Sequence, residues 1–139
     1  MPQAEPPKTL PSITRRLTQE QVQRYALASG DHNPLHLDPQ FAATTPFGRP
    51  IAHGMLTMAF LAEMMAQAFG EAWLKGGKLR VRFKAPVYPG DQVFTWGELL
   101  RWEAGDGYTD LEYAVALKNQ DQQAVLTGTA WVRVPLERV

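Results

Sequence analysis

A short segment of the sequence, SGDHNPLHLDPQF over residues 29–41, concentrates the residue types that move protons. It holds two of the chain's three histidines, and the third, His53, follows in RPIAHGML. The Asn-Pro step indicates a turn, because proline disfavours helical geometry in the residue before it and asparagine caps the amides that follow it. Such a turn brings Asp31 and His36 face to face. An imidazole titrating near neutral pH and a carboxylic acid then form an acid–base pair able to share one water molecule.

A second half of such a site is predicted at Gly54, where a long helix is expected to begin. The first amides of a helix have no partner inside it, and the helix dipole makes this end electropositive, so it stabilises an oxyanion. Glycine also lets a substrate carbonyl approach the backbone closely. The combination indicates that a carbonyl compound is enolised while the nearby acid–base pair transfers protons to or from water. Hydration, dehydration and isomerisation are reactions of this kind.

The helices that position these residues follow from capping signals and periodicity. The sequence TQEQ at residues 18–21 is a capping box that opens a helix ending at Gly30. Asp38 followed by proline predicts a small helix through Thr44. Residues 54–69 are apolar over most of a helix circumference, so we expect this helix to be surrounded on all sides.

Four strand-like runs follow the long helix, namely LRVRF, VFTWGELL, LEYAVALK and AVLTGTAWVRV, with turns at VYPGD, EAGDG and KNQDQ. Because no helix separates them, the sequence predicts an antiparallel sheet in an α+β fold, with the long helix inside a curved sheet. Residues 1–13 are rich in proline and are predicted to form an extended arm that stays out of the core. Residues 14–139 are predicted to form a single domain.

The composition excludes several classes of function. Lysine plus arginine equal aspartate plus glutamate at fourteen each, so no overall field attracts nucleic acid or an anionic membrane. The absence of cysteine excludes disulfides and thiolate chemistry and fits a reducing compartment. The first residues do not form a signal peptide, and the longest apolar run is too short to span a bilayer. We therefore expect a cytoplasmic protein.

The segment SGDHNPLHLDPQFAATTPFGRPIAHGML, with FKAPVYPGD further on, resembles the signature of the MaoC-like hydratases, the (R)-specific enoyl-CoA hydratase and dehydratase family. The resemblance implies a hot-dog fold, with Asp31 and His36 as the catalytic pair and the amide of Gly54 as donor to a thioester carbonyl. It also implies that water adds to a trans-2-enoyl thioester to give an (R)-3-hydroxyacyl thioester. His36 is our candidate base, and Asp31 is the candidate group that holds the water and returns a proton.

The same resemblance implies an acyl-CoA or acyl-carrier-protein thioester as substrate, no cofactor or metal, and at least a homodimer. Ser29 and Asn33 are expected to shape the loop around the catalytic pair. His53 is expected either to contact substrate or to cap the long helix. Met55 and Leu56 are expected either to be core residues or to border the acyl chain.

Other functions remain open at this point. An acyl-carrier-protein dehydratase uses the same acid–base pair, whereas a hot-dog thioesterase or a non-catalytic acyl-thioester-binding module uses the same pocket. A metal site built from His32, His36 and His53 is disfavoured, because no zinc-type spacing such as HExxH is present. Three cations alternate along the first predicted strand and form either a solvated edge or contacts for coenzyme A phosphates: Arg80, Arg82 and Lys84.

Overall fold

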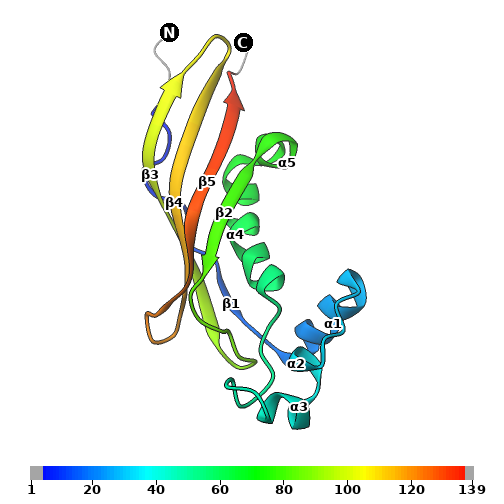
Figure 1. Cartoon of the computed structure of the whole chain (residues 1–139). Coiled ribbons are helices and arrows are strands. Elements are labelled where there is room, and N and C mark those ends of the chain that lie inside the picture. The colour runs from blue at the N-terminus through cyan, green and yellow to red at the C-terminus, as the bar shows by residue number, and fades with distance from the viewer. Residues whose placement is uncertain (1–4, 137–139) are drawn as a thin grey trace.

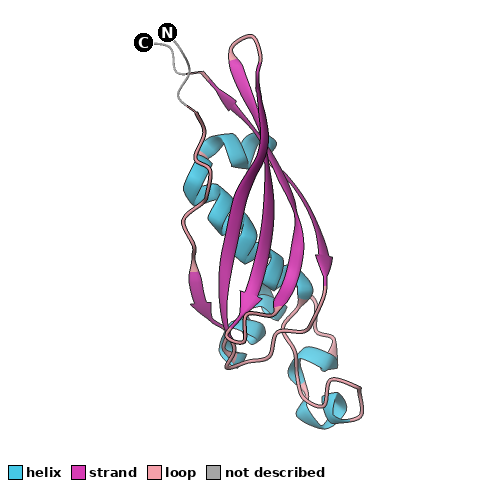
Figure 2. Cartoon of the chain, turned by 90° about the vertical axis from the view of Figure 1, so that its left-hand side faces the viewer, coloured by secondary structure: helices cyan, strands magenta, loops and turns pink. Residues whose placement is uncertain are grey.

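Residues 5–136 contain five strands that form one antiparallel sheet, and their longest helix lies along one of its faces (Figures 1 and 2). A computed structural model describes residues 5–136, so residues 1–4 of the predicted arm and 137–139 of the predicted domain lie outside the described part. The elements in chain order are β1 (Thr14–Arg16), α1 (Gln19–Ser29), α2 (Pro34–Leu37), α3 (Pro39–Ala43), α4 (Gly54–Phe69), α5 (Glu71–Gly76), β2 (Lys78–Phe83), β3 (Gln92–Ala104), β4 (Tyr108–Asn119) and β5 (Ala124–Pro135).

The sheet has the strand order β1-β3-β4-β5-β2. The predicted α+β class and the four predicted strands are confirmed. Strand β4 is central and pairs with β3 and β5 along nearly its whole length, with register shifts at Leu99/Arg101 and Leu117/Lys118. Such irregularities increase the local twist of a sheet, which here curves around α4 (Figure 2).

The core lies between α4 and the concave face of the sheet. Helix α4 contributes Phe60, Leu61, Met64 and Met65, all of which are buried. The sheet covers only one side of this helix, because the side chain of Met55 is 58% exposed and Ala59 is exposed as well. The expectation that α4 is surrounded on all sides is therefore not met within one chain. The polar residue Glu63 of α4 forms an ion pair with Arg15, which ties the short strand β1 to the helix.

The proline-rich segment before β1 enters the core, so its predicted exclusion is wrong. Leu10 is buried, and its amide donates to the carbonyl oxygen of Gly97 over 3.0 Å. The hydroxyl of Tyr113 donates to the carbonyl oxygen of Pro7 over 2.7 Å. The physical reason is the free edge of β3, whose backbone groups need partners that an extended segment supplies.

The helices α1 to α3 form a small lobe beyond the N-terminal end of α4 (Figure 1). The predicted capping box is confirmed, because the Thr18 hydroxyl accepts from the amide of Gln21 over 3.1 Å and the Gln21 side chain accepts from the Thr18 amide over 3.2 Å. Helix α1 ends at Gly30, which has a φ of 78°, and α3 begins after Asp38, as predicted.

Among the helices of residues 5–136, none combines the length and the apolar character needed to cross a lipid bilayer.

Candidate active site

The loop that carries Asp31 is held by hydrogen bonds on every side. The amide of Asp31 donates to the Ser29 hydroxyl over 3.2 Å, and that hydroxyl donates to the carbonyl oxygen of Tyr25 over 2.7 Å. The Asp31 carboxylate accepts from the amide of Asn33 over 3.2 Å. The Asp31 carbonyl oxygen accepts from Nε2–H of His53 over 3.0 Å. The loop thus presents an exposed carboxylate on an ordered backbone.

His36 lies in the four-residue helix α2, and not in an open turn as the sequence predicted. Asn33 begins this helix, because its side-chain oxygen accepts from the amide of Leu35 over 3.0 Å. The His36 side chain is buried, and its Nδ1 lies 2.8 Å from the carbonyl oxygen of Ile51. A carbonyl can only accept, so Nδ1 carries the proton and Nε2 keeps its lone pair. This is the tautomer that a general base requires.

The structure brings the two predicted catalytic side chains together and adds a third. One side-chain nitrogen or oxygen from each of Asp31, His36 and His53 lies within 4.8 Å of the others. A water molecule that hydrogen-bonds to two groups at about 2.8 Å spans a distance of this size. The rings of His36 and His53 are stacked, with centroids 3.9 Å apart and planes inclined by 29°. The ring of Tyr25 also contacts His53, at a centroid distance of 4.8 Å.

These three residues suit proton transfer better than metal binding. Nδ1 of His36 and Nε2 of His53 already donate to backbone carbonyls. Each imidazole therefore has only one nitrogen left for another ligand, and the Asp31 carboxylate already accepts from the amide of Asn33. His32, which the sequence offered as a third ligand, is exposed and does not belong to the cluster found among residues 5–136.

Burial determines the charge state of His53. Removal from water lowers the pKa of His53 from its ordinary value of 6.5, and the nearby His36 lowers this pKa further, against the raising effects of the hydrogen bond to the Asp31 carbonyl and of the Asp31 charge. Its Nδ1 is buried without a hydrogen-bond partner among the described residues. His53 is therefore a neutral imidazole at neutral pH.

The first turn of α4 lies next to His36, and residues of both line one cavity. The first amides that donate within this turn are those of Leu56 and Thr57, which donate to the carbonyl oxygen of His53 over 3.1 and 3.2 Å. The amide of Gly54 comes before them in the chain and has no acceptor inside the helix. A Cβ placed on Gly54 would lie only 2.9 Å from the ring of Phe83. The ring of Phe83 thus packs closely against the backbone at Gly54, and the predicted approach of a substrate carbonyl to this amide stays a prediction.

A cavity of about 300 Å³ is lined by both His36 and Gly54, the first residue of α4. Its lining residues come from α2, the loop before α4, α4 itself, the end of β2 and the segment after β2: His36, Phe47, Ile51, Ala52, Gly54, Thr57, Phe83, Lys84, Ala85, Pro86 and Val87. Met55 and Leu56 do not belong to this lining, so their predicted role at the acyl chain stays a prediction.

Sequence reasoning missed most of the residues that line this cavity, among them Thr57, Ile51 and Phe83. Thr57 is buried, and its hydroxyl donates to the carbonyl oxygen of Gly54 over 2.7 Å. A polar residue on the buried face of an otherwise apolar helix was the signal that could have identified it. Ile51 acts through its backbone and Phe83 reaches the site from a distant strand, so no local sequence pattern could have found either.

A larger hollow of about 730 Å³ lies at the other end of the sheet, around Asp110 and Arg133. These two side chains form an ion pair with each other, with Nε of Arg133 2.8 Å from Oδ1 of Asp110. The described residues that line this larger hollow include no histidine and no free acid–base pair. We therefore place the candidate active site at the smaller cavity.

A buried base, a nearby carboxyl group and an unpaired amide at a helix start define a site for proton transfer next to a carbonyl group. The sequence matches the family model described as "MaoC like domain" over residues 2–120. The chain belongs to this family, which confirms the resemblance found in its sequence.

The relatives of the chain carry matching names. It is 35% identical over 124 residues to the (R)-specific enoyl-CoA hydratase of Aeromonas caviae, a match that covers 88% of this chain and 90% of that one. It is 44% identical over 84 residues to 3-hydroxyacyl-thioester dehydratase Z of Mycobacterium tuberculosis, covering 55% of this chain and 54% of that one. These relatives are hydro-lyases by name, in agreement with the predicted enzyme class.

Solved structures agree with the fold. The (R)-hydratase from A. caviae involved in PHA biosynthesis superposes with a TM-score of 0.79 at 32% identity, covering 95% of this chain and 98% of that one. The R-hydratase PhaJ1 from Pseudomonas aeruginosa gives a TM-score of 0.80 at 30% identity, with coverages of 98% and 85%. The predicted hot-dog fold is confirmed.

Proposed function

We propose that this chain catalyses the (R)-specific hydration of trans-2-enoyl-CoA to (R)-3-hydroxyacyl-CoA and the reverse dehydration. The observation that carries the proposal is the juxtaposition of Asp31 with His36, whose Nδ1 is committed to a backbone carbonyl and whose Nε2 is free to accept a proton. His36 and Gly54, the first residue of α4, line the same cavity. The name and the length of the A. caviae relative support the same reaction.

In the proposed step, the thioester carbonyl oxygen accepts a hydrogen bond from the amide of Gly54. Nε2 of His36 takes a proton from a water molecule held by Asp31, and the water oxygen bonds to the β-carbon. The electron pair of the double bond moves toward the carbonyl, which becomes an enolate oxyanion stabilised at the helix start. The Asp31 carboxylate takes this proton from His36 and gives it to the α-carbon. One water molecule is added and both residues return to their first state.

Incubation with crotonyl-CoA tests this proposal. We expect the absorbance of the conjugated double bond to disappear without release of a free thiol, and chiral chromatography to identify the (R)-3-hydroxybutyryl product. Release of thiol with the double bond intact would instead identify a thioesterase. Tight binding with no turnover would identify an acyl-thioester-binding module.

An acyl-carrier-protein substrate is the second candidate, because the acid–base pair and the Gly54 amide act only on atoms from the thioester carbonyl to the β-carbon. Both carriers present these atoms identically. Comparison of kcat/KM for crotonyl-CoA and crotonyl-acyl-carrier-protein at equal concentration separates the two candidates, and a higher value for the protein carrier would favour the second.

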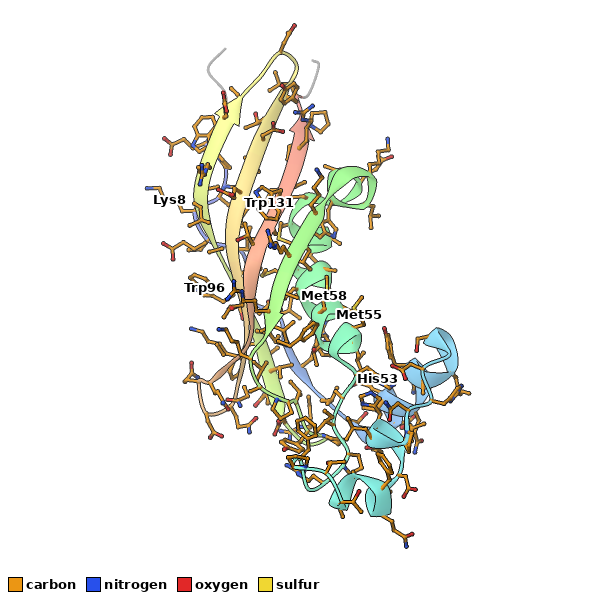
Figure 3. The ribbon with its side chains drawn as sticks, viewed as in Figure 1. Lys8, His53, Met55, Met58, Trp96 and Trp131 are labelled. Atoms are coloured by element: carbon orange, nitrogen blue, oxygen red, sulfur yellow. The ribbon has the colours of Figure 1, made fainter. Side chains whose placement is uncertain are left out.

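The proposal includes catalysis without a metal or cofactor, a cytoplasmic location and a homodimeric assembly. Support for a dimer comes from the side of α4 that faces away from the sheet, where Met55 is 58% exposed (Figure 3). Phe83 at the neighbouring edge strand β2 is 54% exposed. A second copy that covers these side chains removes an apolar surface from water. Sedimentation at micromolar concentration tests this, and a monomeric mass contradicts it.

A further inference from the structure

His53, labelled in Figure 3 just before α4, contacts both the loop that carries Asp31 and the ring of His36. Only 2% of its surface is exposed, so its side chain offers little area to a substrate. Besides its contact with the ring of Tyr25, the His53 side chain interacts with both residues of the acid–base pair. One interaction is the hydrogen bond from Nε2–H to the Asp31 carbonyl oxygen, and the other is the stack on the His36 ring.

We propose that His53 is a positioning residue which, as the neutral Nε2–H tautomer, sets the placement of Asp31 relative to the ring of His36. This inference rests on the proposed function, because it concerns the same acid–base pair. His53 does not touch the reacting atoms in this role. It acts through the backbone of Asp31 on one side and through the ring plane of His36 on the other.

The hydrogen bond to Asp31 fixes the tautomer of His53. Since a carbonyl oxygen only accepts, Nε2 must carry the hydrogen, and Nδ1 keeps a lone pair. This Nδ1 is buried and has no partner among residues 5–136. A second proton at Nδ1 would therefore create a buried charge whose new N–H group has no acceptor.

The neighbours of His53 also favour the neutral form. The titratable groups that face it are Asp31 and His32 on the loop, His36 on α2 and Tyr25 on α1. Two of them are histidines that repel a positive charge, and Asp31 is the one carboxylate. Desolvation outweighs the attraction of that carboxylate, so the pKa of His53 is lowered. A His53 that stays neutral does not compete with His36 for the proton removed from water.

A purely structural role for His53 makes a different prediction. If the ring only fills space between Tyr25 and His36, phenylalanine should replace it well, since it keeps a flat ring at this position. If the Nε2–H donor positions Asp31, glutamine should replace it better, since its side-chain amide can donate at a similar distance from the backbone. The ranking of these two variants therefore separates the two roles.

The first test needs no turnover. The chain has only three histidines, so ¹⁵N spectra of its imidazoles contain few signals, and the His32→Gln variant assigns one set. At neutral pH we expect His53 protonated only at Nε2 and His36 protonated only at Nδ1. Protonation of His53 at Nδ1 or at both nitrogens would overturn the proposal, whatever the substrate of the protein is.

The second test compares His53→Gln and His53→Phe with the wild type and with His32→Gln, in which an exposed histidine of the same loop is changed. We expect His53→Phe to lower kcat by up to about a hundredfold, the scale of a small displacement of reacting groups, with KM nearly unchanged. We expect His53→Gln to recover much of this loss and His32→Gln to behave as wild type. A His53→Phe enzyme equal to or faster than His53→Gln would refute the positioning role. An inactive wild type would refute the proposed function instead.

Discussion

The Nδ1–H group of His36 donates to the carbonyl oxygen of Ile51 over 2.8 Å, and this contact selects which nitrogen of the imidazole can act as a base. The two residues are 15 positions apart, and Ile51 contributes only a backbone atom. The loop that precedes α4 thus orients a side chain of α2. In the neutral ring this hydrogen bond leaves the lone pair on Nε2, the nitrogen that the proposed hydration uses as a base.

Removal of either member of the pair should abolish most of the activity. We expect Asp31→Asn and His36→Gln each to lower kcat with crotonyl-CoA by at least about a hundredfold, the usual contribution of a positioned acid or base. The double variant should lose little more than either single one, because the two groups act on the same water. Far-ultraviolet circular dichroism provides the control for folding. Near-normal turnover in a folded variant would exclude that residue from the mechanism.

Lys84 is the cation that lines the cavity, and it is exposed. If it binds a phosphate of coenzyme A, Lys84→Gln should raise KM by about twofold to fivefold, the scale of an exposed charge pair, and leave kcat nearly unchanged. The matched control is Lys78→Gln, which removes an exposed cation at the other end of β2. Steady-state kinetics at two salt concentrations measures the effect, which should shrink as salt rises. An equal change in both variants would indicate a general charge effect.

Leu10 tests whether the segment before β1 stabilises the fold. Its side chain is 6% exposed and joins the core cluster, so Leu10→Ala should lower the free energy of unfolding by about 2–4 kcal/mol. Leu27, on α1, is 77% exposed and serves as the matched control. We expect Leu27→Ala to change the free energy of unfolding by less than about 0.5 kcal/mol. Urea titration measures both, and equal values would place Leu10 outside the core in solution.

Local patterns were enough to predict the ends of α1, the start of α3 and the strands, because caps, turns and alternation are decided by neighbouring residues. They also predicted Asp31, His36 and Gly54 as site residues within one segment, and the structure brings the side chains of Asp31 and His36 together. The failures share a physical cause. Leu10 is buried only because β3 has a free edge, and the role of His53 depends on contacts with residues 17 and 22 positions away. Such partners are chosen by tertiary packing, which a single sequence does not display.

Acid should destabilise the wild type partly through His53. Burial lowers the pKa of His53 below 6.5 in the folded protein. As the pH falls, the His53 side chain is therefore protonated in the unfolded chain before it is protonated in the folded one. The contribution of His53 is therefore complete above about pH 6.5 and is lost as the pH falls from there toward the pKa of the folded state. His53→Gln cannot bind this proton, so its stability should fall less between about pH 7.5 and about pH 5.5. Urea titrations at both values compare the two proteins. A steeper fall in the variant would show that folding raises this pKa.

Gly54 offers a substitution that should separate activity from stability. A Cβ at this position would lie 2.9 Å from Cε1 of Phe83, whose ring is 54% exposed and can turn away at little cost. Gly54→Ala should therefore change the free energy of unfolding by less than about 1 kcal/mol, because alanine is also a better helix former than glycine.

The activity of Gly54→Ala should respond differently, because the methyl group and the displaced ring occupy the space where the thioester carbonyl must approach the amide. We expect kcat/KM to fall by about tenfold to a hundredfold. Combining Gly54→Ala with Phe83→Leu shows which part matters. Recovery of kcat/KM in the double variant would attribute the loss to the displaced ring, and no recovery would attribute it to the methyl group at the amide. Wild-type kcat/KM in Gly54→Ala would mean that the carbonyl binds elsewhere, since an added methyl group cannot be neutral at a contact between a backbone amide and an oxyanion.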